Sequence, residues 1–358
     1  MKKRTADNNY GVTTMKYALA LGGGGARGAF EAGVWSALRD MNKEITAIAG
    51  TSVGAINGAA FAAGVDAQKL WGEITVQKLI PQAEDENIIS PAALSSAVGT
   101  ILKGGFETDA MKSFLTDILD EKKVRQSGMD YGLCTFSSYS KKPVELFLDR
   151  IPDGKLIDYI IASACFPVFK PVKIKGEEFT DGGIRNNIPI DMLIARGYDT
   201  IISVSVHGIG MIKDADKRGI NLIEIDCERP ECGIMEFDSH KIKRSIRDGY
   251  LNCMKAFGKF SGRSFFIYNR SYSMAAARYG YSFTDGIEQA AELSGVDKNK
   301  PYTFTALVKA VMARYKARPE LARMVELIER EPPCFMHSKL DMLRLFRAAN
   351  AIVYMKNR

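Results

Sequence analysis

Ser52 is the residue whose type and setting first suggest chemistry. It is the centre of a G-x-S-x-G motif at residues 50–54, which follows a predicted buried strand at 45–49 and precedes a helix rich in small residues. Such a turn holds a serine nucleophile on a sharp bend. Gly50 and Gly54 keep side chains away from the strand and the helix that meet there. The motif therefore predicts a nucleophile elbow.

A glycine-rich turn at Gly23–Gly28 fits G-x-G-x-x-G and follows a predicted strand at Lys16–Leu21. In dinucleotide-binding domains such a turn holds a pyrophosphate, and an acidic residue at the end of the next strand holds a ribose. Glu44 precedes that strand, so this site lacks its second half. The backbone N–H groups of this turn could instead hold the oxyanion of a tetrahedral acyl intermediate, with the positive charge of Arg27 beside them. The turn alone leaves both interpretations open, as well as a turn without chemistry.

A serine nucleophile needs a base, and the sequence offers two candidates. His207 is the best placed histidine, because it follows the predicted strand 200–206 and strand C-termini converge on the active edge of a parallel sheet. Asp181 is the other candidate, since Gly182 and Gly183 remove side-chain bulk beside it. A loop histidine and an ordinary Asp-Gly turn remain the simpler local explanations.

Strand, glycine turn and helix occur twice within fifty residues, which predicts βαβ units and an α/β fold with a parallel sheet. Beyond about residue 210 the pattern is mainly helical, most strongly at 236–260 and 303–331. The expected parts are a disordered tail at 1–15, a catalytic domain at 16–208 with a helical insertion or cap at 72–127, and a mainly helical region at 209–358.

The composition of the 358 residues, 46% hydrophobic and 25% charged, is ordinary for a soluble globular protein. Much of the net charge of +7 lies in residues 309–358, where eleven Lys and Arg face five Asp and Glu. A basic segment of this kind predicts salt-sensitive peripheral contact with anionic membranes. The six cysteines form no CxxC pair, and no apolar run approaches the ~18 residues of a membrane span. We therefore expect a cytoplasmic protein.

Four segments, taken in order, resemble the patatin-like phospholipases: Gly23–Gly28, Gly50–Gly54, Ala162–Pro171 and Asp181–Gly183, the last followed by Asn187 and Pro189. The resemblance covers roughly residues 16–208. It implies a three-layer α/β/α fold with a mostly parallel central sheet, related to the catalytic domain of cytosolic phospholipase A2. The mainly helical region after residue 208 resembles bacterial members more loosely.

The resemblance also implies a Ser-Asp dyad without histidine, in which Ser52 is the nucleophile and Asp181 the base. The oxyanion site that it implies comprises Gly23, Gly24, Gly25, Arg27 and Gly28. The implied substrate is a lipid or phospholipid, cleaved through an acyl-serine intermediate without metal or cofactor, and no nucleic acid partner is expected. Two alternatives stay open: a nucleotide-binding module built on the glycine turn, and a membrane-surface or scaffolding protein whose dyad is inactive.

Overall fold

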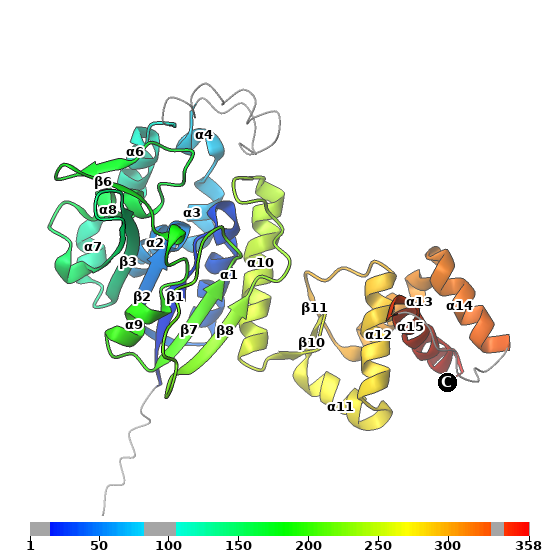
Figure 1. The fold of residues 1–358 in the computed structure, drawn as a ribbon. Helices are drawn as coiled ribbons and strands as arrows, with labels where there is room; N and C mark the ends of the chain where they lie inside the picture. The colour runs from blue at the N-terminus through cyan, green and yellow to red at the C-terminus, as the bar shows by residue number, and fades with distance from the viewer. Residues whose placement is uncertain (1–14, 82–104, 331–339, 358) are drawn as a thin grey trace, which may run out of the picture. The chain divides into compact units, whose positions relative to one another are not determined.

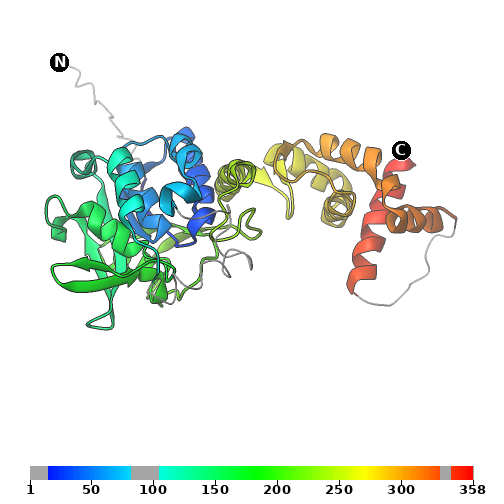
Figure 2. The ribbon, with the colours of Figure 1, turned by 90° about the horizontal axis from the view of Figure 1, so that it is seen from above.

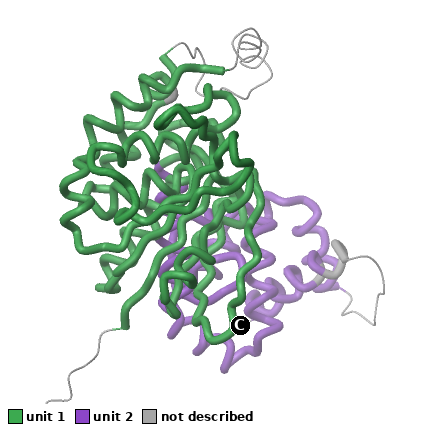
Figure 3. Tube along the Cα trace, turned by 60° about the vertical axis from the view of Figure 1, so that its left-hand side comes forward, with its two compact units in different colours: residues 1–242 green, residues 243–358 purple. Residues whose placement is uncertain are grey.

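The computed structural model describes residues 15–81, 105–330 and 340–357. The chain divides into two compact units, residues 1–242 and 243–358 (Figure 3). Helix α10, Ser239–Ala256, contains the boundary between them. Almost all of the expected disordered tail lies outside the described residues, and so do residues 82–104 of the expected helical insertion.

The described part of the first unit contains one eight-stranded sheet with the order β5-β6-β3-β2-β1-β7-β8, in which β4 also pairs with β3 (Figure 1). The strands are β1 (Lys16–Leu21), β2 (Glu44–Thr51), β3 (Asp130–Ser137), β4 (Lys142–Phe147), β5 (Val172–Ile174), β6 (Glu177–Asp181), β7 (Thr200–Ser205) and β8 (Asn221–Asp226). The neighbours β3, β2, β1, β7 and β8 run parallel, whereas β4, β5 and β6 join by antiparallel pairing. The expected mostly parallel central sheet is confirmed.

The register of the sheet brings the two predicted turns to one edge. Leu21 at the end of β1 lies opposite both Gly50 of β2 and Val204 of β7. The glycine-rich turn after β1 and the serine turn after β2 therefore begin at the same level, at the carboxyl ends of parallel strands. This is the edge at which ligand sites of open α/β sheets form.

Helices cover both faces of the sheet. Ala47 and Ala49 of β2 belong to a buried cluster with α9 (Ile190–Ala195), whereas Ile48 contacts α2 (Val53–Ala62) on the other face. Successive strand residues point to opposite faces, so this alternation places a helix layer on each side. Figure 2 shows the N-terminal helices, coloured blue, gathered on one side of the sheet. The expected three-layer α/β/α arrangement is confirmed.

The remaining helices of the first unit frame the sheet edge or lie on the same side as α2. They are α1 (Ala29–Asp40), α3 (Ala67–Glu73), α4 (Val76–Leu79), α6 (Asp109–Ile118), α7 (Glu121–Gln126) and α8 (Leu156–Ser163), with short 3-10 turns η1 (Gly25–Gly28), η2 (Leu148–Arg150) and η3 (Gly182–Ile184). The rings of Trp35 in α1 and Phe61 in α2 stack with their centroids 4.7 Å apart, and they join the two helices.

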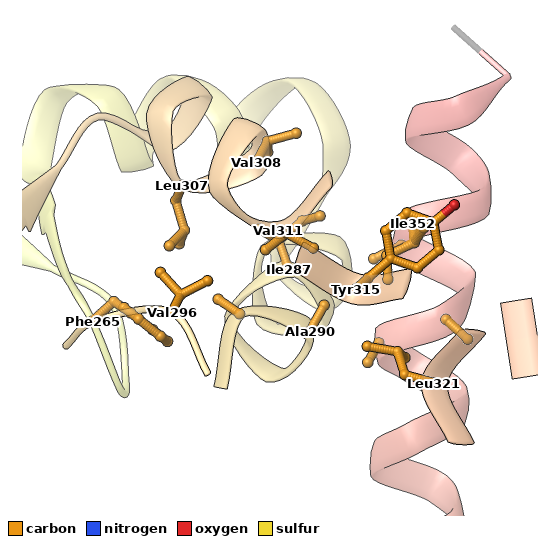
Figure 4. Packing of buried hydrophobic residues seen from close by; sticks show 14 of the residues in the cluster. Phe265, Ile287, Ala290, Val296, Leu307, Val308, Val311, Tyr315, Leu321 and Ile352 are labelled. Atoms are coloured by element: carbon orange, nitrogen blue, oxygen red, sulfur yellow. The ribbon is translucent and has the colours of Figure 1, made fainter. Parts of the chain in front are cut away.

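The second unit is mainly helical in its described part, with one small sheet. Its elements after α10 are β9 (Phe260–Ser261), β10 (Phe266–Tyr268), α11 (Asn269–Tyr279), α12 (Tyr281–Leu293), β11 (Pro301–Tyr302), α13 (Phe304–Arg314), η4 (Tyr315–Ala317), α14 (Pro319–Arg330) and α15 (Leu340–Lys356). Its core buries Ile287 of α12 with Leu307 of α13 and Ile352 of α15 (Figure 4). The single helix expected at 303–331 is wrong, because Arg318 is extended before Pro319 and separates two helices.

Three further properties follow from the described residues. None of their helices is both long enough and apolar enough to cross a membrane. Their five cysteines are free and buried, while Cys334 lies outside the described ranges. Within these ranges no group of three or more His, Cys, Asp or Glu residues could hold a metal ion.

Candidate active site

Ser52 lies on a strained turn between β2 and α2. Its φ of 56° and ψ of −125° are unusual for a residue with a side chain, and such strain is typical of functional turns. The turn is held from α8, since the Ser52 N–H donates to Ser163 Oγ at 2.9 Å and that hydroxyl donates to the Cys134 carbonyl at 2.6 Å. The geometry of this turn is that of the predicted nucleophile elbow.

The two glycines of the elbow are required by close backbone approach. A Cβ at Gly50 would lie 2.2 Å from the Gly54 carbonyl oxygen, and a Cβ at Gly54 would lie 2.5 Å from the Leu21 carbonyl oxygen. Both distances are far below van der Waals contact. Alanine at either position would force the strand, the helix or the neighbouring β1 to move.

Asp181 ends β6 and faces Ser52 from the opposite side of the site. Its carboxylate is buried, accepts the Gly183 N–H at 2.8 Å and accepts a hydrogen bond from the Ser52 hydroxyl. Burial raises the pKa of Asp181 to about 6, although the hydrogen bonds from Ser52 and Gly183 oppose that rise. The carboxylate is therefore a stronger base than an ordinary aspartate, yet it is largely ionised at neutral pH.

Gly182 and Gly183 allow this loop to lie against its neighbours. A Cβ at Gly182 would lie 2.2 Å from the Cys134 carbonyl oxygen, and one at Gly183 would lie 2.8 Å from Asn187 Oδ1. The loop is thus pressed against β3, the same strand that the Ser163 hydroxyl reaches. Strand β3 therefore fixes the positions of both Ser52 and Asp181.

The glycine-rich turn presents backbone N–H groups beside Ser52. Within the described residues, the N–H groups of Gly24 and Gly25 have no hydrogen-bond acceptor, while that of Gly23 donates to the Asn187 carbonyl at 3.0 Å. Gly25 has a φ of 58°, and a Cβ there would lie 2.0 Å from the Ile234 carbonyl oxygen. Of the four glycines in the predicted oxyanion site, Gly24 and Gly25 therefore have backbone N–H groups that lie in the pocket lining without an acceptor in the described residues.

Arg27 and Gly28 lie farther from the pocket, and neither is among its lining residues. The Arg27 guanidinium donates to the carbonyl oxygens of Cys232 at 3.0 Å and His207 at 2.6 Å, and thereby ties the turn to two other loops. A Cβ at Gly28 would lie 2.5 Å from Val53 Cγ2, so this glycine permits close packing on the start of α2. A direct contact of Arg27 with an oxyanion stays a prediction.

The structure describes two of the three histidines. His207 Nε2 lies 2.8 Å from Asp226 Oδ1, and the His207 side chain is half exposed and absent from the pocket lining. His240 is exposed near the start of α10, and His337 lies outside the described residues. Neither described histidine contacts Ser52.

Asn187 is a site residue that the motif reasoning did not assign. It is buried and lines the pocket, and its Nδ2 donates to the Gly23 carbonyl at 3.3 Å. Its backbone accepts the Gly23 N–H and donates to the Met211 carbonyl. Asn187 therefore joins the glycine-rich turn to the loop of Asp181. The only signal for it in the sequence was its place shortly after the Asp-Gly-Gly motif.

A pocket of about 760 Å³, part of which is open solvent, adjoins Ser52 and Asp181. The polar groups lie at one end, with the glycines and Asn187, and most other lining side chains are apolar. Helices α3, α4 and α6 and their flanks contribute Trp71, Ile74, Leu79, Met111, Phe114 and Leu115. Part of the predicted insertion at 72–127 therefore forms a wall of this pocket.

A buried polar group supports the elbow from behind. Asn57 of α2 donates to Glu31 Oε2 at 2.8 Å and to the Gly28 carbonyl at 2.9 Å, and it accepts the Trp71 indole N–H at 3.0 Å. Burial raises the pKa of Glu31 to about 8, so this side chain is mainly neutral at pH 7. The network connects α1, α2 and the wall helix α3.

Comparison with known proteins identifies the domain that carries this site. The family model described as "Patatin-like phospholipase" matches residues 19–194. An uncharacterized NTE family protein of Mycobacterium tuberculosis is 33% identical over 210 residues, which are 58% of this chain and 54% of that protein. Patatin-like phospholipase domain-containing protein 7 of Rattus norvegicus is 29% identical over 205 residues, 54% of this chain and 14% of that protein.

The chain thus matches about half the length of the mycobacterial relative. Among solved structures, VipD from Legionella pneumophila aligns with a TM-score of 0.43 and 14% identity, over 95% of this chain and 92% of that chain. The family match includes the end of β1, the glycine-rich turn, the elbow and the Asp-Gly-Gly loop. Residues 19–194, which carry Ser52 and Asp181, belong to the patatin-like phospholipase family.

Proposed function

We propose that this chain is a lipid acyl hydrolase in which Ser52 is the nucleophile and Asp181 its base. The observation that supports this most strongly is the hydrogen bond from the Ser52 hydroxyl to a buried carboxylate with a pKa of about 6, at the polar end of an apolar pocket. The strained conformation of Ser52 and the family of the domain add to it.

Acylation begins when the Ser52 hydroxyl attacks an ester carbonyl carbon and its proton passes to Asp181. A bond forms from Ser52 Oγ to that carbon, and the carbonyl oxygen becomes an oxyanion. When this intermediate collapses, the ester C–O bond breaks, and the leaving alkoxide takes the proton from Asp181 and departs as an alcohol or lysolipid. A carboxylate with a raised pKa suits both the acceptance and the return of this proton.

The oxyanion needs fixed donors, and the Gly24 and Gly25 N–H groups are the best candidates. They lie in a turn that lines the same pocket as Ser52, and in the described structure neither has another acceptor. One such donor typically contributes about 2.7–4 kcal/mol of transition-state stabilisation. Arg27 acts in this proposal by holding the turn in place through its bonds to the carbonyls of Cys232 and His207.

Deacylation repeats the proton transfers with water. Asp181 accepts a proton as water attacks the acyl-serine carbonyl, and it returns that proton to Ser52 Oγ as the acyl group leaves as a fatty acid. Every step uses only side chains and backbone groups of the first unit. A histidine is not needed, which agrees with the contact of His207 with Asp226 instead of Ser52.

The apolar lining favours an acyl chain as the group bound beside Ser52. Phe114, Phe166 and Phe169 offer contact surface to methylene groups and few hydrogen bonds to a sugar or a pyrophosphate. This argues against the nucleotide-binding alternative. A phospholipid or another lipid ester satisfies the same geometry, with its head group outside the pocket.

A fluorophosphonate probe tests the proposal directly, because it forms a covalent bond with an activated serine. We expect labelling at Ser52 in the parent protein, none in Ser52→Ala, and normal labelling in Ser140→Ala, where the exposed Ser140 provides a matched control. Mass spectrometry of a lipid extract should then show free fatty acid released by the parent and not by Ser52→Ala. A folded parent protein that neither reacts nor releases fatty acid would exclude the hydrolase.

A further inference from the structure

Four exposed apolar side chains gather beside the pocket and form what we call the rim patch: Ile184, Ile209, Met211 and Ile212. Their exposed fractions are 41%, 67%, 56% and 59%. In the described part of the first unit, only Met15 and Tyr139 are further large apolar residues of comparable exposure. Monomeric proteins rarely leave such side chains grouped in solvent without a function.

The rim patch is fixed directly onto the two loops of the site. Met211 donates its N–H to the Gly183 carbonyl at 3.0 Å and accepts the Asn187 N–H at 2.7 Å. A Cβ at Gly208 would lie 1.8 Å from the Gly23 carbonyl oxygen, and one at Gly210 would lie 2.0 Å from the Gly183 carbonyl oxygen. Residues 208–212 therefore lie flat against both the glycine-rich turn and the Asp181 loop.

The patch is also continuous with the pocket lining, because Ile209 belongs to both. Arg185, which is exposed, contacts the Met211 sulfur at 4.0 Å, and no carboxylate of the described residues pairs with it. A cation beside apolar side chains matches the boundary between the phosphates and acyl chains of a lipid surface. Ile209 therefore joins the exposed patch to the pocket that Ser52 lines.

We propose that the rim patch docks the first unit onto the surface of a phospholipid bilayer, so that an acyl chain passes from the bilayer into the pocket. This inference rests on the proposed function for its purpose, since a long-chain lipid is present in aggregates and not as a free monomer. The rim patch is distinct from the basic segment at 309–358. Its binding is mainly apolar, so high salt weakens it little.

The test measures binding to phosphatidylcholine vesicles in the Ser52→Ala protein, so that hydrolysis cannot change the vesicles. We expect Met211→Ser/Ile212→Ser to lower the partition coefficient by roughly tenfold or more, because membrane affinity follows the apolar area that is buried. The matched control is Met274→Ser/Leu327→Ser, which changes residues with exposed fractions of 65% and 55% in the second unit. This control should lower binding less than about twofold.

A second arm uses proteins with Ser52 intact and reports the ratio of vesicle hydrolysis to hydrolysis of a short-chain monomeric ester. The rim variant should lower this ratio, whereas the control variant should not. Equal vesicle binding by parent and rim variant would overturn the docking surface, even if the ester is hydrolysed. A parent that dimerises through the patch in gel filtration, with no patch-dependent binding to vesicles, would also overturn it. Patch-dependent binding without any ester hydrolysis would instead contradict the proposed function alone.

Discussion

Asp181 of the first unit and Glu288 of the second are both buried, and they differ in their partners. Glu288 of α12 accepts the backbone N–H groups of Arg263, Ser264 and Phe265 at 3.0, 2.8 and 3.1 Å, and it closes the loop between β9 and β10. Asp181 in the first unit accepts one backbone N–H, from Gly183, and the hydroxyl of Ser52 beside a pocket.

This difference separates a carboxylate that holds structure from one that can react. The oxygens of Glu288 are occupied by fixed donors, so a change there leaves three backbone N–H groups without their acceptor. Asp181 has few fixed donors and lies against a space that a substrate can enter, and burial raises its pKa. Burial of an acidic residue therefore indicates a site only when its partners leave the carboxylate available.

The largest expected effect is that of Asp181→Asn, which should lower kcat/KM for a monomeric ester by about a thousandfold or more, since no base remains.

The same change should stabilise the fold at about pH 8. The pKa of Asp181 is about 6 in the folded protein and 3.8 for an ordinary aspartate, so ionisation lowers the stability of the fold progressively between pH 4 and pH 6 and by a constant amount above that range. The free energy of unfolding of Asp181→Asn should therefore exceed that of the parent by up to about 3 kcal/mol at pH 8, and this difference should vanish near pH 4. Urea unfolding at both pH values measures the gain, and turnover near that of the parent would exclude Asp181 as the base.

Glu288→Ala should have the opposite pattern. We expect it to lower the free energy of unfolding of the second unit by about 3 kcal/mol, because three backbone N–H groups, of which that of Phe265 is buried, lose their acceptor. Fluorophosphonate labelling per folded molecule should persist, as Ser52 and Asp181 belong to the other unit. Exposed Glu326 of α14 provides the control, and Glu326→Ala should change stability by less than about 0.5 kcal/mol. Equal effects of the two substitutions would remove the contrast between the carboxylates.

A smaller effect is expected from pH alone. Only the ionised carboxylate accepts the Ser52 proton, so kcat/KM should rise with pH through about 6 and then level off. One unit below that pKa, activity should be about tenfold below the plateau. A rate profile with a monomeric ester and a stability check at each pH measures this. An inflection near the ordinary value of an aspartate would show that burial does not tune this group.

The smallest expected effect is that of His207→Asn. His207 has a φ of 49°, which asparagine tolerates, and its contact with Asp226 is half exposed. Both activity and stability should stay close to those of the parent, with less than about 1 kcal/mol of stability lost. An activity loss of several orders of magnitude would restore a histidine triad and make the comparison of the two carboxylates irrelevant to catalysis.

Much of the fold could be predicted from local patterns. Strand β1 was predicted with its observed bounds, and the bounds predicted for β2 and β7 differ from the observed ones by at most two residues at each end. These elements have continuous apolar runs or glycine turns that define their ends. Strand β8 escaped prediction because it pairs only with β7 in the described sheet and half of its side chains reach solvent, so its residues lack a buried-strand pattern.

The site was less accessible to sequence reasoning, because its geometry depends on contacts between distant segments. The motifs predicted that Ser52 and the glycines form turns, but not that Gly23 uses its N–H to hold Asn187. The raised pKa of Asp181 depends on burial by the assembled fold. The part played by Ser163, whose hydroxyl holds the elbow, has no local signal beyond its place in the segment Ala162–Pro171.

The attachment of residues 208–212 to the loops of the site has a consequence for local unfolding. The Met211 N–H donates to the Gly183 carbonyl, and the Asn187 N–H donates to the Met211 carbonyl. Neither amide hydrogen can exchange with solvent while its hydrogen bond is intact. Because these bonds follow one another, we expect the three segments to open together in hydrogen exchange. Residues 208–212 and the loop of Asp181 should therefore share a single opening free energy, and slow amide exchange at Met211 would report that these contacts are intact.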